Sequence, residues 1–412
     1  MQFDFNFYSS ILLIFFVHGL VYSVLLAKRG FITNNNSSKW LSAFLILCIF
    51  YISSWMLGFA GWYDHQPYRD IMFYTPLQLL YFIGPVIYFY VKSLLNPAFS
   101  FGKKQWLHFI PGIIFLLFCL VVVITDKLVL KKYYFLVNGQ DPEFDIWYQF
   151  TGFASMLYYF LITLKYYKLY KKIIVQTVSY ADVVIFKWVQ HFLYAFLAMI
   201  FFKVLFYIGS FIPFFANLNY EGPWWEFLVF AILFYYIAVS GYANAVVTKV
   251  PYKLHFLPHK IMASLPIVYP TVQNQVQPIP EAEYIEVEEA NTITTDNTLI
   301  NEWKPKIEAL LQKQKLHENP ELTLTQLAKQ LNTNASIISK VINQGFGLNF
   351  NDFINKYRIE AVKEKLMAGE QKTQTLLGIA YDCGFNSKAT FNRSFKKFTG
   401  TTPKDFFINT SA

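Results

Sequence analysis

Residues 376–398 read LLGIAYDCGFNSKATFNRSFKKF, and this stretch decides how the C-terminal part of the chain folds. From Leu376 to Cys383, apolar side chains recur at the i, i+3, i+4, i+7 spacing of one helical face, which predicts a short amphipathic helix. Gly384 follows and can adopt the positive φ of a tight turn. The next helix buries Phe391 and Phe395, and its outward side chains are Lys388, Asn392, Arg393, Lys396 and Lys397. Two short helices around a tight turn, the second one basic, predict a helix-turn-helix unit.

The same arrangement occurs earlier in the chain, beginning at Thr323. Thr323 and Gln326 form a capping box, which predicts a helix start. The apolar face of this helix consists of Leu324, Leu327, Ala328 and Leu331. A second helix follows a polar turn and exposes Ser336, Ser339, Lys340 and Asn343. Because Arg, Lys and Asn side chains match base edges and neutralise phosphates, the second helix of each unit is a candidate DNA reader.

A third amphipathic segment, residues 349–368, connects the two units. Its apolar face includes Phe353, Ile354, Tyr357 and Ala361. As a helix it would be about 30 Å long, close to the ~34 Å that separates successive turns of B-DNA. A rigid connector of this length predicts that one chain places two recognition helices in adjacent major grooves.

These residues resemble the AraC/XylS family of bacterial transcription regulators over residues 299–409. The second unit carries the more specific part of the resemblance, in Ile379-Ala380, Gly384-Phe385, Ser387, Phe391, Arg393, Phe395-Lys396-Lys397, Gly400 and Thr402-Pro403. Asn343, Gly347, Asn349-Phe350, Asn355 and Tyr357-Arg358 precede it. The resemblance implies sequence-specific binding to double-stranded promoter DNA, usually activation, and RNA polymerase as a partner. By the family's pattern, base contacts come from Ser336, Ser339, Lys340, Lys388, Asn392 and Arg393.

Two features depart from that family. Ser336 and Ser339 are small, which makes the first recognition helix the weaker reader, and Phe407 stands where many members have arginine. The resemblance does not extend into the N-terminal part, where family members more often carry a soluble sugar-binding domain.

The N-terminal part has the composition of a membrane protein. The whole chain is 55% hydrophobic, 20% aromatic and only 15% charged, against about 25% charged for an average soluble protein. Each of seven apolar stretches is long enough for a helix to cross the hydrocarbon layer of a bilayer. They lie at 8–27, 40–60, 71–91, 106–124, 147–167, 189–212 and 224–245. We therefore expect an all-α protein, a seven-helix membrane bundle followed by a soluble helical domain.

Basic residues orient this bundle. The connections at 28–39, 92–105 and 165–187 are rich in Lys and Arg, and Asp182 is the one acid among them. The alternate connections carry more acids than bases. Because basic loops stay in the cytoplasm, the N-terminus is expected outside and the C-terminal domain inside, in a multi-pass protein of the bacterial inner membrane.

Polar residues within spans are candidates for sensing a signal. Lys203, Gln78 and His191 are such residues, although Lys203 is also expected to pair with a neighbouring helix and stabilise packing. The outer connection at 125–146 contains Asp141, Glu143 and Asp145, for which a solvated surface is favoured over a ligand site. The signal expected is an unidentified small molecule or envelope component.

The sequence predicts three domains: a membrane domain at 1–248, a Pro-rich and then acidic flexible linker at 249–298, and a DNA-binding domain at 299–412. No catalytic motif and no cysteine or histidine cluster is apparent, so we expect no enzyme activity, cofactor or metal. Membrane lipid is an expected partner, and formation of a homodimer is left open. The alternative hypothesis is a transporter-like or receptor-like membrane protein whose cytoplasmic helical tail binds a partner protein.

Overall fold

A computed structural model describes residues 3–96, 99–137, 141–181, 187–209, 223–244 and 292–411. The chain divides into two compact units. The membrane unit comprises Met1–Lys168 and Phe186–Tyr252, and the C-terminal unit comprises Leu169–Ile185 and Lys253–Ala412. Within the described residues the regular secondary structure of both units is helical, apart from one isolated β-bridge, which confirms the all-α prediction.

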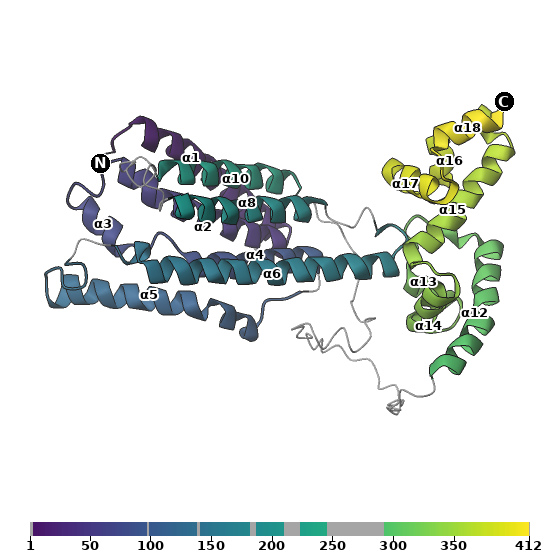
Figure 1. The fold of residues 1–412 in the computed structure, drawn as a ribbon, viewed down its shortest axis with the longest axis horizontal. Coiled ribbons are helices and arrows are strands. Elements are labelled where there is room, and N and C mark those ends of the chain that lie inside the picture. Colours follow the sequence, from purple (N-terminus) through teal and green to yellow (C-terminus); the bar gives the residue numbers. More distant parts are fainter. Residues whose placement is uncertain are drawn as a thin grey trace. The chain divides into compact units, whose positions relative to one another are not determined.

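The membrane unit contains five helical segments that are long and apolar enough to cross a membrane (Figure 1). They are α1 (Phe7–Ile32), α2 (Asn36–Phe59), the segment Lys103–Val129 around α5 (Ile110–Val123), α8 (Lys187–Gly209) and α10 (Trp224–Ala243). α2 is the innermost of the five and packs against α1 and α10. Five of the seven predicted stretches therefore correspond to such helices, and seven spans are not established.

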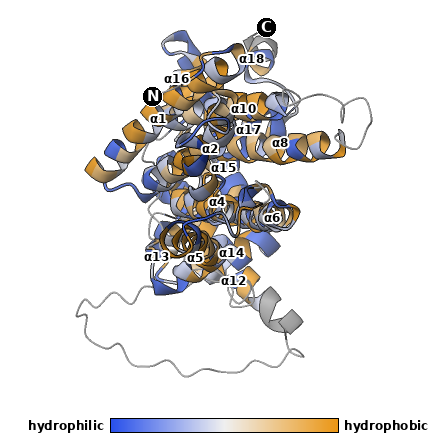
Figure 2. Ribbon diagram, turned by 90° about the vertical axis from the view of Figure 1, so that its left-hand side faces the viewer, coloured by the Kyte–Doolittle hydropathy of each residue, from blue (hydrophilic) through white to orange (hydrophobic). Residues whose placement is uncertain are grey.

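The outer surface of this unit is apolar. On α1, the exposed large side chains recur at helical spacing as Ile14, Val17, Val21 and Val24. On α8, they are Tyr194, Leu197, Phe201, Leu205 and Ile208. In the hydropathy colouring of Figure 2, α8 is mostly apolar along its length. Contiguous exposed apolar faces of this extent are costly in water and match a lipid environment.

The third predicted stretch, 71–91, is not one helix, and this prediction was wrong. It is divided between α3 (Tyr68–Tyr74) and α4 (Leu80–Leu95), with a non-helical break at residues 75–79. Other elements satisfy the backbone of the break: Gln78 N donates to Glu143 Oε1 at 3.0 Å, and the Tyr148 hydroxyl donates to Gln78 O. Non-helical backbone in a membrane protein is tolerated where other protein groups bury it and satisfy its hydrogen bonds in this way.

The fifth predicted stretch, 147–167, lies in α6 (Ile146–Thr177), the longest helix that the structure describes. α6 is not among the five apolar segments, because Tyr, Lys and Gln side chains interrupt its apolar run. The last part of α6, from Leu169 to Thr177, belongs to the C-terminal unit.

The C-terminal unit contains two cores on one shared helix, α15 (Phe350–Met367). The first core joins α15 to α12 (Thr292–Gln314), α13 (Leu324–Gln330) and α14 (Ala335–Lys340). The second joins α15 to α16 (Leu376–Asp382) and α17 (Lys388–Thr399), and α18 (Pro403–Ser411) packs on α17. Phe353 lies in the first core and Val362 in the second. The connector α15, which is labelled in Figure 1, is therefore a structural part of both helix-turn-helix units.

Local sequence signals explain where these helices begin and end. The predicted capping box is present, since Thr323 N donates to Gln326 Oε1 at 2.8 Å and Gln326 N donates to Thr323 Oγ1 at 3.2 Å. Gly384 has the predicted positive φ, at +92°. The connector is an α-helix of 18 residues, about 27 Å long. The predicted linker at 249–298 lies mostly outside the described residues, and α12 begins within it at Thr292.

Candidate nucleic-acid interface and membrane polar sites

The first recognition helix is α14 with its continuation η5 (Val341–Gly345), which is a short π-helix. Asn334 caps α14 by accepting from Ser336 N at 2.9 Å. Ile338 and Val341 are buried, whereas Ser336 is exposed. Ser339, Lys340 and Asn343 are half-buried. Short hydroxyl side chains and a single lysine give this helix little reach toward a base edge.

The second recognition helix, α17, is more strongly basic. Ser387 caps it by accepting from Thr390 N at 3.1 Å, and Phe391 and Phe395 bury its inner face. Its exposed polar side chains are Lys388, Asn392, Arg393, Lys396 and Lys397, and the helix contains no acid. All five predicted residues therefore lie on the solvent face, where they can reach phosphates and base edges.

Lys397 is engaged within the protein. Its Nζ lies 2.6 Å from Asp352 Oδ2, in the first turn of α15. Asp352 is held in place by Asn349, whose Nδ2 donates to Asp352 Oδ2 at 2.7 Å. This ion pair fixes the end of α17 against the start of the connector, so Lys397 has an orienting role that spacing alone did not predict.

Comparisons with known proteins agree with this geometry. Residues 327–408 match the family model described as a helix-turn-helix domain. The C-terminal part of the chain is an AraC-type helix-turn-helix domain. An uncharacterized HTH-type transcriptional regulator of Staphylococcus aureus (strain COL) is 36% identical over 91 residues, which cover 22% of this chain and 12% of that protein. YtdP, an HTH-type transcriptional regulator of Bacillus subtilis (strain 168), is 29% identical over 86 residues, 21% of this chain and 11% of that protein. No solved structure matches the chain significantly.

The similarity to these two regulators covers 22% and 21% of this chain. The chain spans about an eighth of the length of the curated relatives it matches. The membrane unit lies outside the matched residues, and its role has to be argued from its own side chains.

The three candidate sensing residues lie in different surroundings of the membrane unit. Lys203 Nζ on α8 is 3.2 Å from Glu226 Oε1 on α10 and 2.9 Å from the Tyr51 hydroxyl on α2, so it joins three helices, as the packing interpretation expects. Gln78 is buried at the α3–α4 break, while His191 is exposed on α8. The structure does not bring these residues together into one site.

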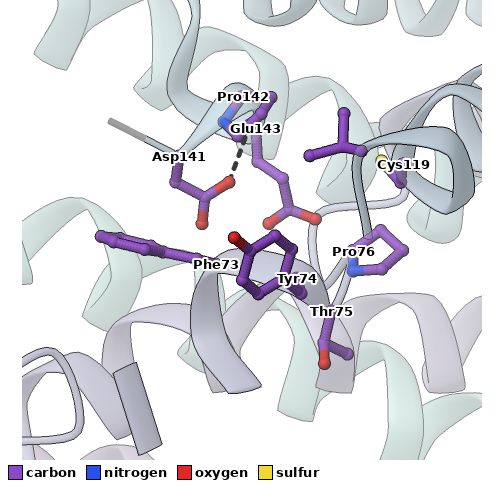
Figure 3. A pocket seen from close by; sticks show the side chains of 9 residues that line it. Phe73, Tyr74, Thr75, Pro76, Cys119, Asp141, Pro142 and Glu143 are labelled. Atoms are coloured by element: carbon purple, nitrogen blue, oxygen red, sulfur yellow. Dashed lines mark hydrogen bonds between the residues drawn. The ribbon is translucent and has the colours of Figure 1, made fainter. Parts of the chain in front are cut away.

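The connection at 125–146 contains a buried acidic pair that the sequence did not predict. The expectation of a solvated surface was wrong for Asp141 and Glu143, which are 6% and 3% exposed. Figure 3 shows both carboxylates in a small pocket that Phe73, Tyr74 and Pro76 also line. Glu143 N donates to Asp141 Oδ1 at 3.0 Å. Burial raises the pKa of Asp141 to about 7 and that of Glu143 to about 9, and the neighbouring Asp141 charge contributes to the latter.

These pKa values predict how stability depends on pH. In the unfolded chain both carboxyls ionise near pH 4, whereas in the folded state they retain protons to about pH 7 and 9. The folded state binds more protons across this window, so stability falls as pH rises from 5 to 9. We expect the melting temperature of the purified protein to drop by about 5 °C or more over this range. Tryptophan fluorescence would follow it, because every Trp except Trp303 lies before residue 253.

The Glu143→Gln variant should flatten this pH dependence. The matched control is Asp64→Asn, which neutralises an exposed acid and should leave the slope as it is in the unmodified protein. Equal slopes in all three proteins would contradict the assignment to the buried pair.

Proposed function

We propose that this protein is a membrane-tethered, one-component transcription regulator. The membrane unit crosses the bilayer seven times, with the third crossing interrupted at residues 75–79. The N-terminus therefore lies outside and the AraC-type domain lies in the cytoplasm, where its two recognition helices bind promoter DNA. The signal that the membrane unit senses then changes promoter binding. The observation that carries the proposal is the pairing, in one chain, of an apolar helical bundle with an AraC-type domain whose α17 exposes only basic and neutral side chains.

Two features support the DNA-binding part. α15 belongs to both hydrophobic cores, so the recognition helices are mounted on one rigid scaffold. Its length of about 27 Å is near the ~34 Å repeat of B-DNA, as two adjacent major grooves require. Lys388, Asn392 and Arg393 occupy the first half of α17, the part of a recognition helix that reaches base edges.

Replacing Arg393 with alanine is expected to weaken binding to a cognate promoter fragment by about 10- to 100-fold. A bidentate contact from arginine to guanine contributes about 1–3 kcal/mol of discrimination. Full-length protein in lipid nanodiscs would be titrated with fragments recovered from a genome-wide map of its binding sites, with fluorescence anisotropy as the readout.

Lys313→Ala is the matched control, because it removes one exposed positive charge from α12 outside both recognition helices. It should change affinity by less than about threefold, through the general electrostatic contribution alone. If the Arg393 and Lys313 variants bind equally well, α17 does not read the promoter.

The sensing part of the proposal requires the membrane unit to do more than anchor the domain. Of the candidate residues, Gln78 is best placed, because its side chain and backbone tie the α3–α4 break to Ser54, Glu143 and Gln149. Replacing the membrane unit with a single unrelated span tests this part. Regulation that persists unchanged would reduce the unit to an anchor.

A further inference from the structure

The end of α6 is part of the C-terminal unit. α6 continues to Thr177, about 15 Å beyond the end of the span predicted at residue 167. Val178 then pairs with Thr323 in an isolated antiparallel β-bridge, and Ser179 N donates to Leu322 O at 3.1 Å. Val178 and Ser179 are fully buried. A segment that precedes the AraC-type domain by more than a hundred residues is thus packed into its first helix-turn-helix unit.

Arg358 of the connector recognises Ser179 directly. Its Nη1 donates to Ser179 O at 3.2 Å and its Nη2 donates to Ser179 Oγ at 2.9 Å. Asn351 lies about two helical turns before Arg358 in the connector, and its Nδ2 donates to the same Ser179 O at 2.8 Å. Arg358 and Asn351 are 1% and 3% exposed. Hydrogen bonds from a charged group are among the stronger ones in proteins, so this is a built contact with defined geometry.

The remaining Arg358 donors complete the arrangement. Nε donates to His317 O at 2.8 Å, Nη2 to Asn319 O at 2.7 Å, and Nη1 to Asn355 Oδ1 at 3.1 Å. A guanidinium has five N–H donors and no acceptor, and five hydrogen bonds are present here. Two of these hydrogen bonds end on Ser179. All five donors of the buried Arg358 guanidinium are therefore hydrogen-bonded only when Ser179 is docked against the connector.

The contact reaches the face that the proposed function assigns to DNA. Gln176 Oε1 accepts from Asn343 Nδ2 at 3.3 Å, and the same Nδ2 lies 3.3 Å from Ser339 Oγ. Asn343 and Ser339 both belong to the predicted DNA-reading set of the first recognition helix. An amide that donates to Gln176 is not available to a base edge, and duplex DNA at this face would need the space that Gln176 occupies.

We propose that residues 176–180 are an intramolecular docking segment that competes with DNA for the first helix-turn-helix unit. Its partner is the surface formed by Leu322, Thr323, Asn343, Asn351 and Arg358. This inference rests on the proposed function, because the docked segment would restrain the promoter binding that the proposed function assigns to this domain. α6 is one uninterrupted helix from Ile146 to Thr177, so a movement of α6 within the membrane unit would pull on the segment directly.

A reversible disulfide tests this proposal in the full-length chain. Opposed residues of an antiparallel pair have Cα atoms about 4.5–5.5 Å apart, within the range that a disulfide spans. Val178→Cys with Thr323→Cys would be introduced after replacing Cys48, Cys119 and Cys383 with alanine. Peptide mass spectrometry would detect the bond, and a non-reducing gel would separate an intramolecular bond from one between two copies. The single Val178→Cys variant is the control.

We expect the bond to form within one chain and the oxidised protein in nanodiscs to bind its mapped promoter fragment at least tenfold more weakly than after reduction. The Gln176→Ala, Ser179→Pro double variant, which removes three of the docking hydrogen bonds, should bind several-fold more tightly than the unmodified protein. Equal affinities before and after reduction, or a bond that forms only between copies or not at all, would overturn the proposal. If the bond forms within one chain but neither state binds promoter DNA, it is the proposed function that fails, and competition with DNA fails with it.

Discussion

Replacing Arg358 with methionine is expected to destabilise the C-terminal unit by about 3–5 kcal/mol, because several buried acceptors lose their donor at once. Methionine keeps much of the side-chain volume but none of the five donated hydrogen bonds. His317 O would then be left without this donor in a buried site, and an unsatisfied buried group costs about 1–3 kcal/mol. Pulse proteolysis of the full-length protein in increasing urea would measure the loss, since cleavage reports the population of the unfolded unit.

Two further variants show whether the loss comes from the buried contacts. Lys356→Met lies on the same helix at an exposed position and should change stability by no more than about 0.5 kcal/mol. Arg358→Lys retains the charge but offers three donors from a single point. We therefore expect its loss of stability to lie between those of Lys356→Met and Arg358→Met. A loss below about 1 kcal/mol for Arg358→Met would mean that water replaces the guanidinium without penalty.

The elements predicted well from sequence are those that local signals specify. The connector was predicted at 349–368 and is found at Phe350–Met367, because Asn349 caps it and its apolar face repeats with helical period. The turn at Gly384 and the exposed face of α17 were predicted for the same reason. Each depends on residues only a few positions apart in the chain.

What the sequence did not predict depends on partners that are distant in the chain. The 71–91 stretch is apolar enough for one helix, yet its break is stabilised by Glu143 and Tyr148, which come from another part of the membrane unit. The burial of Asp141 and the docking of Ser179 are likewise set by tertiary packing. One signal was available for Arg358: it stands four residues after Ile354, on the apolar face of the predicted connector, where an isolated arginine indicates a buried polar contact.

Gly384→Ala is expected to destabilise the C-terminal unit by about 3 kcal/mol or more. Gly384 has a φ of +92°, which alone costs a residue with a side chain about 1–2 kcal/mol. An added Cβ would also lie 2.3 Å from His317 O and 2.8 Å from Glu318 C. Both are backbone atoms, so neither can move aside as a flexible side chain could, and overpacking adds about 1–3 kcal/mol. Pulse proteolysis in urea would again measure the change.

Gly400→Ala separates the two contributions. Gly400 ends α17 with a φ of +79°, but no atom lies within 4 Å of the position an added Cβ would take. It should therefore lose only the conformational part, about 1–2 kcal/mol. Equal losses at the two glycines would show that the close approach to His317 is relieved by a backbone shift. Arg358 Nε donates to the same His317 O, so such a shift would also disturb the Arg358 contact. The separate losses of stability in Gly384→Ala and Arg358→Met would then sum to more than the loss in the Gly384→Ala, Arg358→Met double variant.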